Sequence, residues 1–317
     1  MKKKCLVLND REALPEAALA DIAHLVDISW EQDPPERFSL EEAVQRNKDT
    51  QVIITTYMDL KGHILEQMPG LEAIITTTIS THFIDSGYCK KKGIKVFNTE
   101  NYTGTSVAEH AVALMMATIR HIPKVDNEVK QQGNNNCFEY RGIELYGKTA
   151  GIIGFGNIGS TIARLLSGFG MKLQYYNRSP KSSNIAQQVE LYDLLSSSDI
   201  VFLSLPLNHE SHEIIREETL ARMKKTAVLI NVSPDEVMDI DAVKQALSRG
   251  DIAAAGLDLL QTGVFKDLSN TVLTPRRAWY TEDCFNRRIG MWKSTLVNFV
   301  EGKSQKDIAD SDFVPIG

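Results

Sequence analysis

The chain has 317 residues, which at about 150 residues per domain predicts two domains. Hydrophobic residues make up 43% and charged residues 24% of the sequence, a composition that excludes disordered and fibrous proteins. The formal net charge of −6 argues against a general nucleic-acid surface, because such surfaces are usually strongly basic.

Cysteine usage and hydropathy predict a cytoplasmic protein without a metal site. The four cysteines form no closely spaced metal-ligand or redox pair, so a reducing compartment is expected. The apolar run Cys5–Leu8 is too short for a signal peptide, and no stretch reaches the roughly 18 apolar residues of a membrane helix. Two histidines and two glutamates in segment 207–213 are expected to form a solvated loop. We therefore expect no metal, membrane or nucleic-acid partner.

The first hundred residues alternate between apolar runs and helical spacing. Segments 14–23 and 60–68 have helical spacing. The expected strands are Cys5–Leu8, Leu25–Ile28, Val52–Ile54, Ala73–Ile75 and Lys95–Phe97. Such alternation predicts βα units around a parallel sheet.

A long apolar helix is expected next, over Ser106–Arg120. It is apolar on most faces, so we expect it to be buried between domains or subunits. The polar, Asn-rich segment 131–137 is expected to be a loop.

The alternation resumes at Thr149 and predicts one doubly wound domain inserted into another. The expected strands are Thr149–Gly154, Lys172–Tyr176, Ile200–Ser204, Ala227–Asn231, Ile252–Gly256 and Thr271–Leu273. The expected helices are Ile158–Phe169, Asp239–Arg249 and Glu282–Val300, the last returning to the first domain.

A glycine-rich turn carries the strongest chemical signal. Gly154, Gly156 and Gly159 form a G-x-G-x-x-G pattern that closes an apolar strand and opens a helix through Asn157 and Ile158. This context predicts a dinucleotide site with the pyrophosphate on the helix N-terminus. A purely structural turn is the alternative.

The end of the next strand predicts the choice of nicotinamide cofactor. A carboxylate there accepts the ribose hydroxyls of NAD, but this chain has Asn177, Arg178 and Ser179, followed by Lys181. The side chains of the last three residues can donate charge-assisted hydrogen bonds to a 2′-phosphate. We expect NADP(H) to be preferred, with NAD(H) as the second cofactor. A solvated basic turn is the alternative.

Several segments, taken in order, resemble the D-isomer-specific 2-hydroxyacid dehydrogenases, including glyoxylate and hydroxypyruvate reductases. The resemblance rests on segments 98–111, 147–159, 201–208, 229–232, 255–258 and 272–275. It implies an α/β protein of two doubly wound parallel-sheet domains, in which a Rossmann-type domain (103–285) is inserted into a flavodoxin-like substrate domain (1–102 plus 286–317).

The resemblance also implies partners and further cofactor contacts. Val107, Pro206, Val232 and Asp258 line the nicotinamide end by position, and Asp258 accepts from the carboxamide. For Asp258 a strand-end cap is the alternative. The family further implies a small-molecule substrate and a homodimer built on the long apolar helix.

Three positions depart from the catalytic pattern of that family. Pro234 stands where the family has its substrate-binding Arg, Gly263 where it has a Glu, and Arg276 where it has the acid/base His. The substrate-side glycine loop is also replaced, by the threonine-rich segment 76–85. Loss of the acid/base alone would cost about 10²–10⁴-fold in rate, so ordinary 2-hydroxyacid turnover is not expected.

Two functions remain open from the sequence. In the first, the chain is an NAD(P)-dependent oxidoreductase in which Arg276 anchors an anionic substrate or stabilises an oxyanion, because Arg cannot shuttle a proton. The substrate would be a carbonyl, imine or activated alkene, and Arg277 and Tyr57 are further candidates for polarising it. His82, Tyr280 or water then donates the proton. In the second, the chain is a catalytically inactive dinucleotide-binding protein that acts as a redox-responsive interaction partner.

Overall fold

The computed structural model describes every residue except 1, 9–15, 32–37, 134–135, 137 and 309–317. The chain folds as two units, Met1–Tyr102 with Glu282–Gly317 and Thr103–Thr281. The chain therefore returns to the first unit between residues 281 and 282, rather than between 285 and 286 as expected. The reason is that helix α10 (Glu282–Val300) starts there and belongs wholly to the first unit. Each unit has its own parallel sheet, so the α/β class with two such sheets is confirmed.

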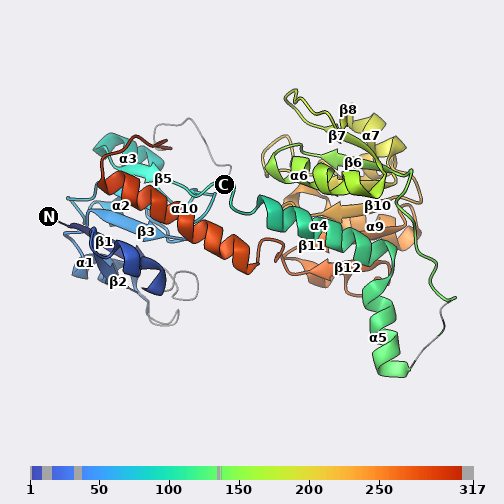
Figure 1. Ribbon diagram of the computed structural model, residues 1–317, viewed down its shortest axis with the longest axis horizontal. Coiled ribbons are helices and arrows are strands. Elements are labelled where there is room, and N and C mark those ends of the chain that lie inside the picture. The colour runs from blue at the N-terminus through green and yellow to red at the C-terminus, as the bar shows by residue number, and fades with distance from the viewer. Residues whose placement is uncertain (1, 9–15, 32–37, 134–135, 137, 309–317) are drawn as a thin grey trace. The chain divides into compact units, whose positions relative to one another are not determined.

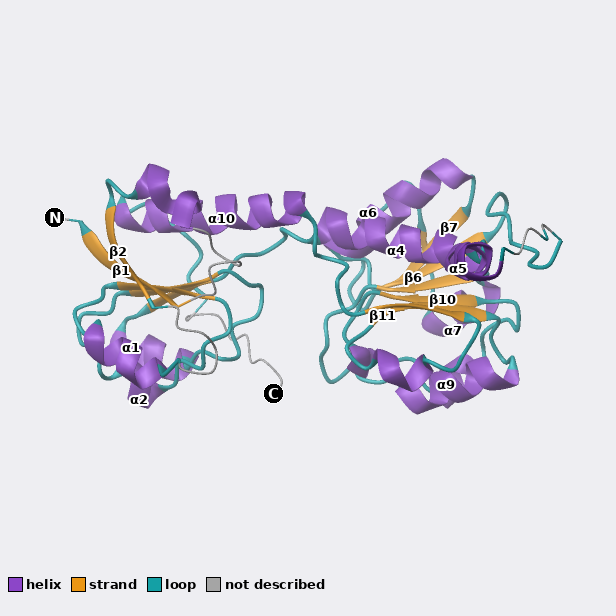
Figure 2. Cartoon of the chain, turned by 90° about the horizontal axis from the view of Figure 1, so that it is seen from below, coloured by secondary structure: helices purple, strands orange, loops and turns teal. Residues whose placement is uncertain are grey.

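The first unit is a five-stranded sheet with the order β2-β1-β3-β4-β5 and parallel pairing throughout. Its strands are β1 Lys3–Leu8, β2 Val26–Trp30, β3 Val52–Thr55, β4 Ala73–Thr76 and β5 Lys95–Phe97. Its other helices are the 3₁₀ helix η1 Glu16–Ile22, α1 Leu40–Arg46, α2 Gly62–Leu65 and α3 Ser86–Lys92. α10 covers one face of this sheet, and α1 and α2 cover the other (Figure 2).

The two expected helices of this unit are shorter than their spacing predicts. Segment 60–68 contains only the single turn α2, and segment 14–23 contains η1, with residues 14 and 15 outside the described part. Clear cap residues are present where a helix is regular: Asp85 accepts the Tyr88 amide at the start of α3, and Gly93 ends it with φ +72.

The second unit is a seven-stranded sheet with the order β12-β11-β10-β9-β6-β7-β8, again all parallel. Its strands are β6 Thr149–Ile153, β7 Lys172–Tyr176, β8 Gln187–Gln188, β9 Ile200–Leu203, β10 Val228–Asn231, β11 Ala254–Asp258 and β12 Thr271–Thr274. Four central strands are buried almost throughout, as expected for parallel strands covered on both faces.

Two layers of helices cover this sheet (Figure 2). α4 (Gly104–Ile119) and α6 (Asn157–Leu166) pack into one core cluster, and α7 (Leu191–Ser197), α8 (Glu217–Leu220) and α9 (Ile240–Arg249) pack into the other. The remaining short turns are η2 Ser167–Phe169, η3 Asp235–Val237 and η4 Thr262–Phe265.

Helix α5 (Ile122–Gln132) was not anticipated from the sequence. It follows α4 after His121, which adopts the left-handed conformation with φ +54, and it ends at Gly133. Consequently the first two residues of segment 131–137 are helical rather than loop, and 134, 135 and 137 lie outside the described residues. α5 projects away from the sheet of its unit (Figure 1), and none of its residues is buried.

Candidate active site

The carboxyl ends of the second sheet bring the expected cofactor residues to one edge. All seven strands are parallel, so the loops that follow them open at the same side. β6 lies between β9 and β7, where the strand order reverses, and such a switch point is where open α/β sheets bind ligands. The expected residues follow β6 (Gly154, Gly156, Asn157, Ile158, Gly159), β7 (Asn177, Arg178, Ser179), β9 (Pro206), β10 (Val232) and β12 (Arg276), and Asp258 ends β11.

The glycine turn has the geometry of a phosphate cradle. Gly154 has φ +93, and a Cβ there would lie 2.6 Å from the Ser204 carbonyl oxygen. A Cβ on Gly159 would overlap the Gly154 carbonyl oxygen, so this helix can pack so closely only without a side chain. Gly156 is exposed and a Cβ on it would meet nothing within 4 Å. The open space over Gly156 and the N-terminus of α6 fits a dinucleotide pyrophosphate.

Asn177 shapes the neighbouring turn after β7. Its Oδ1 accepts the Phe155 amide at 3.0 Å and its Nδ2 donates to the Ser179 carbonyl at 2.7 Å. These bonds tie the turn to the glycine loop and leave Arg178 and Ser179 exposed. The turn borders a cavity of about 530 Å³, which is lined by Tyr176, Asn177, Arg178, Ser179, Lys181, Leu205, Pro206, Asn208, Glu210, Ser211 and Ile214.

Glu210 is the acidic residue of this cavity that sequence reasoning passed over. Its carboxylate forms an ion pair with Arg178 Nη1, and His209 Nε2 lies 3.8 Å from its other oxygen. Segment 207–213 was interpreted as a solvated loop, and no local pattern in it indicates that Glu210 reaches the turn after β7.

At the other end of the edge, Asp258 organises the loop after β12. The Thr274 hydroxyl donates to Oδ1 at 2.6 Å, and the amides of Arg277 and Ala278 donate to Oδ1 and Oδ2 at 2.8 and 2.9 Å. The carboxylate is buried, with 4% exposure. Asp258 therefore fixes the backbone that presents Arg276.

Arg276 is held in an uncommon backbone conformation with φ +46. Its amide donates to the Thr274 carbonyl at 3.0 Å. Its guanidinium Nη1 lies 3.8 Å from Asp235 Oδ1, and its side chain is 39% exposed. Left-handed non-glycine residues cluster at functional sites, where the surrounding structure holds them.

Asp235 is a second residue that the sequence did not single out as functional. It is 3% exposed and accepts the amides of Leu260 and Gln261 at 2.9–3.2 Å. A buried carboxylate of this kind is stable only when it is hydrogen-bonded and paired. Asp235 follows β10 by a few residues, and that position at a strand's carboxyl end is the signal that could have identified it.

Two further polar groups lie at this end of the edge. Asn231, the last residue of β10, is fully buried; its Oδ1 accepts the Ser233 amide at 2.8 Å, but its Nδ2 has no acceptor among the described residues. His110 on α4 hydrogen-bonds Thr274 at 3.0 Å. Burial lowers the pKa of His110, Asp258 opposes this effect and Arg277 adds to it, so the imidazole is neutral near pH 7.

The expected proton donors lie in different surroundings. His82 belongs to the first unit, is exposed and shares a 2.7 Å hydrogen bond with Ser80. Tyr280 belongs to the second unit and is 56% exposed, and Tyr57 of the first unit is 67% exposed. Val107 is buried on α4, whereas Pro206 is exposed and Val232 partly so.

In the first unit, the loops after β3, β4 and β5 are held by hydrogen bonds of threonine hydroxyls rather than formed by glycines. Thr56 and Thr77 share a 2.9 Å hydrogen bond, and Thr78 donates to the carbonyls of Thr56 and Ser80 at 3.3 and 2.9 Å. Thr99 donates to the Thr76 carbonyl at 2.8 Å. These bonds fix the loops by side-chain contacts instead of by glycine's conformational freedom.

Within the described ranges, three or more histidine, cysteine or acidic side chains never come together in a way that could hold a metal ion. The same ranges contain no helix long and apolar enough to span a membrane.

Comparison with known protein families and sequences adds the following. The model of the D-isomer specific 2-hydroxyacid dehydrogenase NAD binding domain matches residues 112–278. The glyoxylate reductase of Pyrococcus furiosus is 31% identical, over 100% of this chain and 98% of that protein. The glycerate dehydrogenase of Methylorubrum extorquens is also 31% identical, over 84% of this chain and 87% of its own length.

Two solved structures are similar to this chain along nearly its whole length. An acyclic imino acid reductase (Bsp5) in complex with NADPH and D-Arg has a TM-score of 0.84 and 31% identity, covering 96% of this chain and 99% of that one. A D-2-hydroxyisocaproate dehydrogenase has a TM-score of 0.86 over 97% of this chain and 99% of its own, but at 24% identity it shows the fold alone. By its sequence, its glycine cradle and its two-sheet fold, this chain belongs to the D-isomer specific 2-hydroxyacid dehydrogenase family of NAD(P)-binding oxidoreductases.

Proposed function

We propose that the protein is an NADPH-dependent reductase of acyclic 2-imino acids. One observation carries this proposal: the residue after Thr274-Pro275, where the family pattern has an acid/base His, is Arg276, whose guanidinium faces the buried carboxylate of Asp235. A guanidinium stays charged at every accessible pH, so this position offers a fixed cation and no exchangeable proton.

Imine reduction is a reaction that can proceed with Arg276 in place of the acid/base His. A carbonyl oxygen that accepts hydride must also receive a proton, which a general acid normally supplies. The nitrogen of a protonated imine already carries its protons, so the C=N electron pair becomes the amine lone pair and water later protonates it. NADPH, when bound, supplies the hydride to the imine carbon. The chain's own residues then need to bind and orient the substrate, with no proton to deliver.

Arg276 is the proposed anchor for the substrate carboxylate. Pro234 stands at the position of the family's substrate-binding Arg, and Arg276 reaches back to the neighbouring residue, Asp235. The guanidinium fork matches a carboxylate in a bidentate manner. The 3.8 Å separation from Asp235 is longer than a hydrogen bond, so some donors of Arg276 remain for a ligand.

Cofactor preference is part of the proposal. Arg178, Ser179 and Lys181 line a cavity beside the glycine cradle, where the ribose 2′ position of a dinucleotide falls in Rossmann folds. The acyclic imino acid reductase of similar structure was solved with NADPH and D-Arg, which supports both the cofactor and the substrate class. Val107, Gly154, Asn157, Ile158, Pro206, Val232 and Asp258 remain proposed cofactor contacts, and Tyr280, which belongs to the same unit as Arg276, is proposed to orient the substrate.

The decisive experiment supplies one substrate in two forms. Pyruvate and other 2-oxo acids are incubated with the protein and NADPH, with and without excess ammonium, which forms the imine. We expect NADPH oxidation and the amino acid as product only when ammonium is present. Equal turnover without ammonium, with a 2-hydroxy acid as product, would show an ordinary dehydrogenase. No oxidation in either case would favour the non-catalytic, redox-responsive binding protein.

We also propose that a second copy of the chain covers α5. Ile122, Val125 and Val129 share one face of this helix and are 53%, 39% and 44% exposed. An apolar stripe on a helix without buried residues is typical of an interface. Sedimentation velocity should give a dimer for the native chain and a monomer for Val125→Asp; a native monomer at micromolar concentration contradicts this proposal.

A further inference from the structure

The cavity after β7 contains a charge that opposes a phosphate. Arg178, Lys181 and Ser179 contribute donors to it, but Glu210 contributes a carboxylate from the loop after β9. The ion pair between Glu210 and Arg178 joins two segments that lie 32 residues apart in the chain. The guanidinium that is proposed to bind the 2′-phosphate thus already has an anionic partner inside the protein.

The loop that carries Glu210 is fixed by hydrogen bonds. Asn208 Oδ1 accepts the amides of Glu210 and Ser211 at 2.9 and 3.0 Å. Ser211 is 5% exposed, and its hydroxyl donates to the Pro206 carbonyl at 2.7 Å and accepts the Asn208 amide at 2.8 Å. The backbone of Glu210 is therefore held beside the cavity, so its carboxylate can change partner by a rotation of the side chain alone.

We propose that Glu210 sets the ratio of NADPH to NADH affinity by competing with the 2′-phosphate for Arg178. This inference rests on the proposed cofactor site. When NADPH binds, its phosphate replaces the carboxylate as the partner of Arg178, and Glu210 turns toward His209, which lies 3.8 Å away. When NADH binds, Arg178 keeps its partner and the ribose 2′-hydroxyl donates to Glu210. The same carboxylate thus weakens NADPH binding and supports NADH binding.

The physical basis is like-charge repulsion combined with exchange of partners. A phosphate carries about −1.5 to −2 charges near neutral pH, so a carboxylate within the same cavity disfavours it. The pair is partly exposed, with 68% and 47% of the two side chains accessible, and exposed pairs contribute little to stability. Loss of the carboxylate should therefore change cofactor selection far more than folding.

The test compares Glu210→Gln with a matched control, Glu218→Gln. Glu218 also forms an exposed ion pair with an arginine, Arg216, but it does not line the cavity. Dissociation constants for NADPH and NADH are measured by nicotinamide fluorescence at one low salt concentration, with thermal unfolding recorded for each variant. Glu210→Gln should tighten NADPH binding about tenfold, or ~1.4 kcal/mol, and leave NADH binding unchanged or weaker. Glu218→Gln should change neither constant.

A third variant, Arg178→Ala, separates this inference from the proposed cofactor preference. If Arg178→Ala weakens NADPH selectively while Glu210→Gln leaves the NADPH/NADH ratio unchanged, the role of Glu210 is overturned and the NADPH site stands. If Arg178→Ala leaves the ratio unchanged, both are overturned. In the double variant the gain from Glu210→Gln should shrink to less than about threefold, because the partner that the carboxylate blocks is gone. A full tenfold gain in the double variant contradicts competition for Arg178.

Discussion

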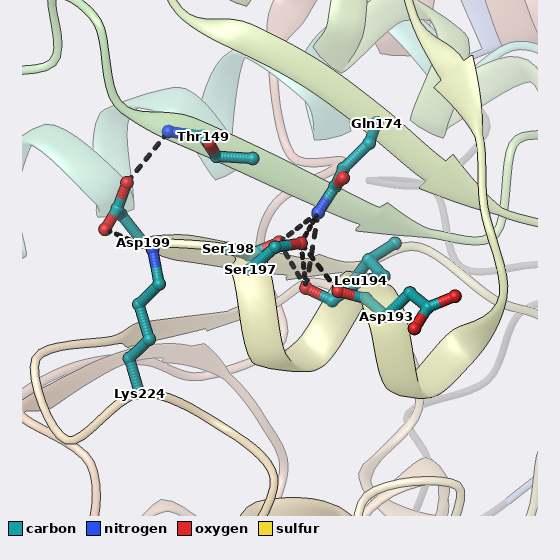
Figure 3. Close-up of polar contacts among 8 residues, drawn as sticks. All are labelled: Thr149, Gln174, Asp193, Leu194, Ser197, Ser198, Asp199 and Lys224. Atoms are coloured by element: carbon teal, nitrogen blue, oxygen red, sulfur yellow. Dashed lines mark hydrogen bonds and ion pairs between the residues drawn. The ribbon is translucent and has the colours of Figure 1, made fainter.

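The two edges of the seven-stranded sheet differ in how completely their polar groups are matched. At the amino edge, Asp199 accepts the Thr149 amide and Lys224 Nζ, both at 2.9 Å (Figure 3). Beside it, Gln174 donates to the hydroxyls of Ser197 and Ser198 at 2.6 and 3.0 Å. The side chains of Asp199, Lys224 and Gln174 therefore all have partners within the protein.

At the carboxyl edge, by comparison, two polar groups lack a close partner within the described part of the chain. Asn231 Nδ2 is buried without an acceptor among the described residues, and Arg276 is 3.8 Å from its carboxylate partner. Buried polar groups are normally satisfied, and the exceptions require an explanation. We infer from this contrast that the amino edge of the sheet contributes to stability, whereas the carboxyl edge keeps donors for the proposed ligand.

The largest expected effect follows from a change of Arg276 at the carboxyl edge. Arg276→Ala should lower kcat/KM for the imino acid by about 10–100-fold, because the side chain is 39% exposed and lost hydrogen bonds to a charged group cost roughly 1.5–3 kcal/mol. The NADPH dissociation constant should stay the same. Steady-state kinetics with a 2-oxo acid and ammonium, together with fluorescence titration of NADPH, measure both quantities.

Asp235→Asn serves as the comparison variant. It keeps the size of the side chain and one acceptor for the Leu260 and Gln261 amides but removes the charge that faces Arg276. We expect a smaller loss, mainly in KM, because the guanidinium remains but is less well oriented. A native kcat/KM in Arg276→Ala would show that Arg276 does not bind the substrate.

The second effect concerns Asp199 at the amino edge of the sheet, and it should change only the free energy of unfolding. Burial acts to raise the pKa of Asp199, but the Thr149 amide and Lys224 outweigh it and hold the pKa below its usual 3.8. Asp199→Asn should lower the free energy of unfolding by about 1–3 kcal/mol at pH 7, as expected for lost hydrogen bonds to a charged group. Kinetic constants should not change.

The pH dependence of that loss has a definite sign. A depressed carboxyl pKa stabilises the fold above its unfolded value and loses this contribution as the pH falls through the folded value. The difference between native protein and Asp199→Asn should therefore be full at pH 7 and shrink below about pH 4. Urea unfolding at several pH values measures it; a difference that grows in acid would contradict the assigned pKa direction.

The smallest effect distinguishes two glycines of the same turn. Gly156→Ala should lower stability only slightly, since a Cβ there meets nothing within 4 Å and the residue caps α6, yet weaken NADPH and NADH alike by about tenfold because the pyrophosphate approaches the backbone closely. Gly154→Ala, with φ +93 and a 2.6 Å approach to Ser204, should instead destabilise the unit. Unaltered dinucleotide affinity in Gly156→Ala would place the phosphates elsewhere.

Local patterns were sufficient for part of the architecture. Apolar runs such as Val52–Ile54 and Ala73–Ile75 lie within strands of the predicted type, because buried parallel strands are nearly continuous apolar segments. Helix α5 was missed because its residues are polar on most sides and none of them is buried in the unit. Segment 60–68 has helical spacing but yields only one turn, since Pro69 and Gly70 follow and the chain bends toward β4.

Local sequence patterns predict the βα alternation, the glycine turn that closes β6, and the replacement of a carboxylate by Asn177 after β7, since each depends on neighbouring residues. Only the tertiary structure brought Glu210 to Arg178 and Asp235 to Arg276. The physical reason is that each pair joins loops at the carboxyl ends of different strands, and their distance depends on the order of strands in the sheet. That order is set by long-range packing, which no local pattern of residues records.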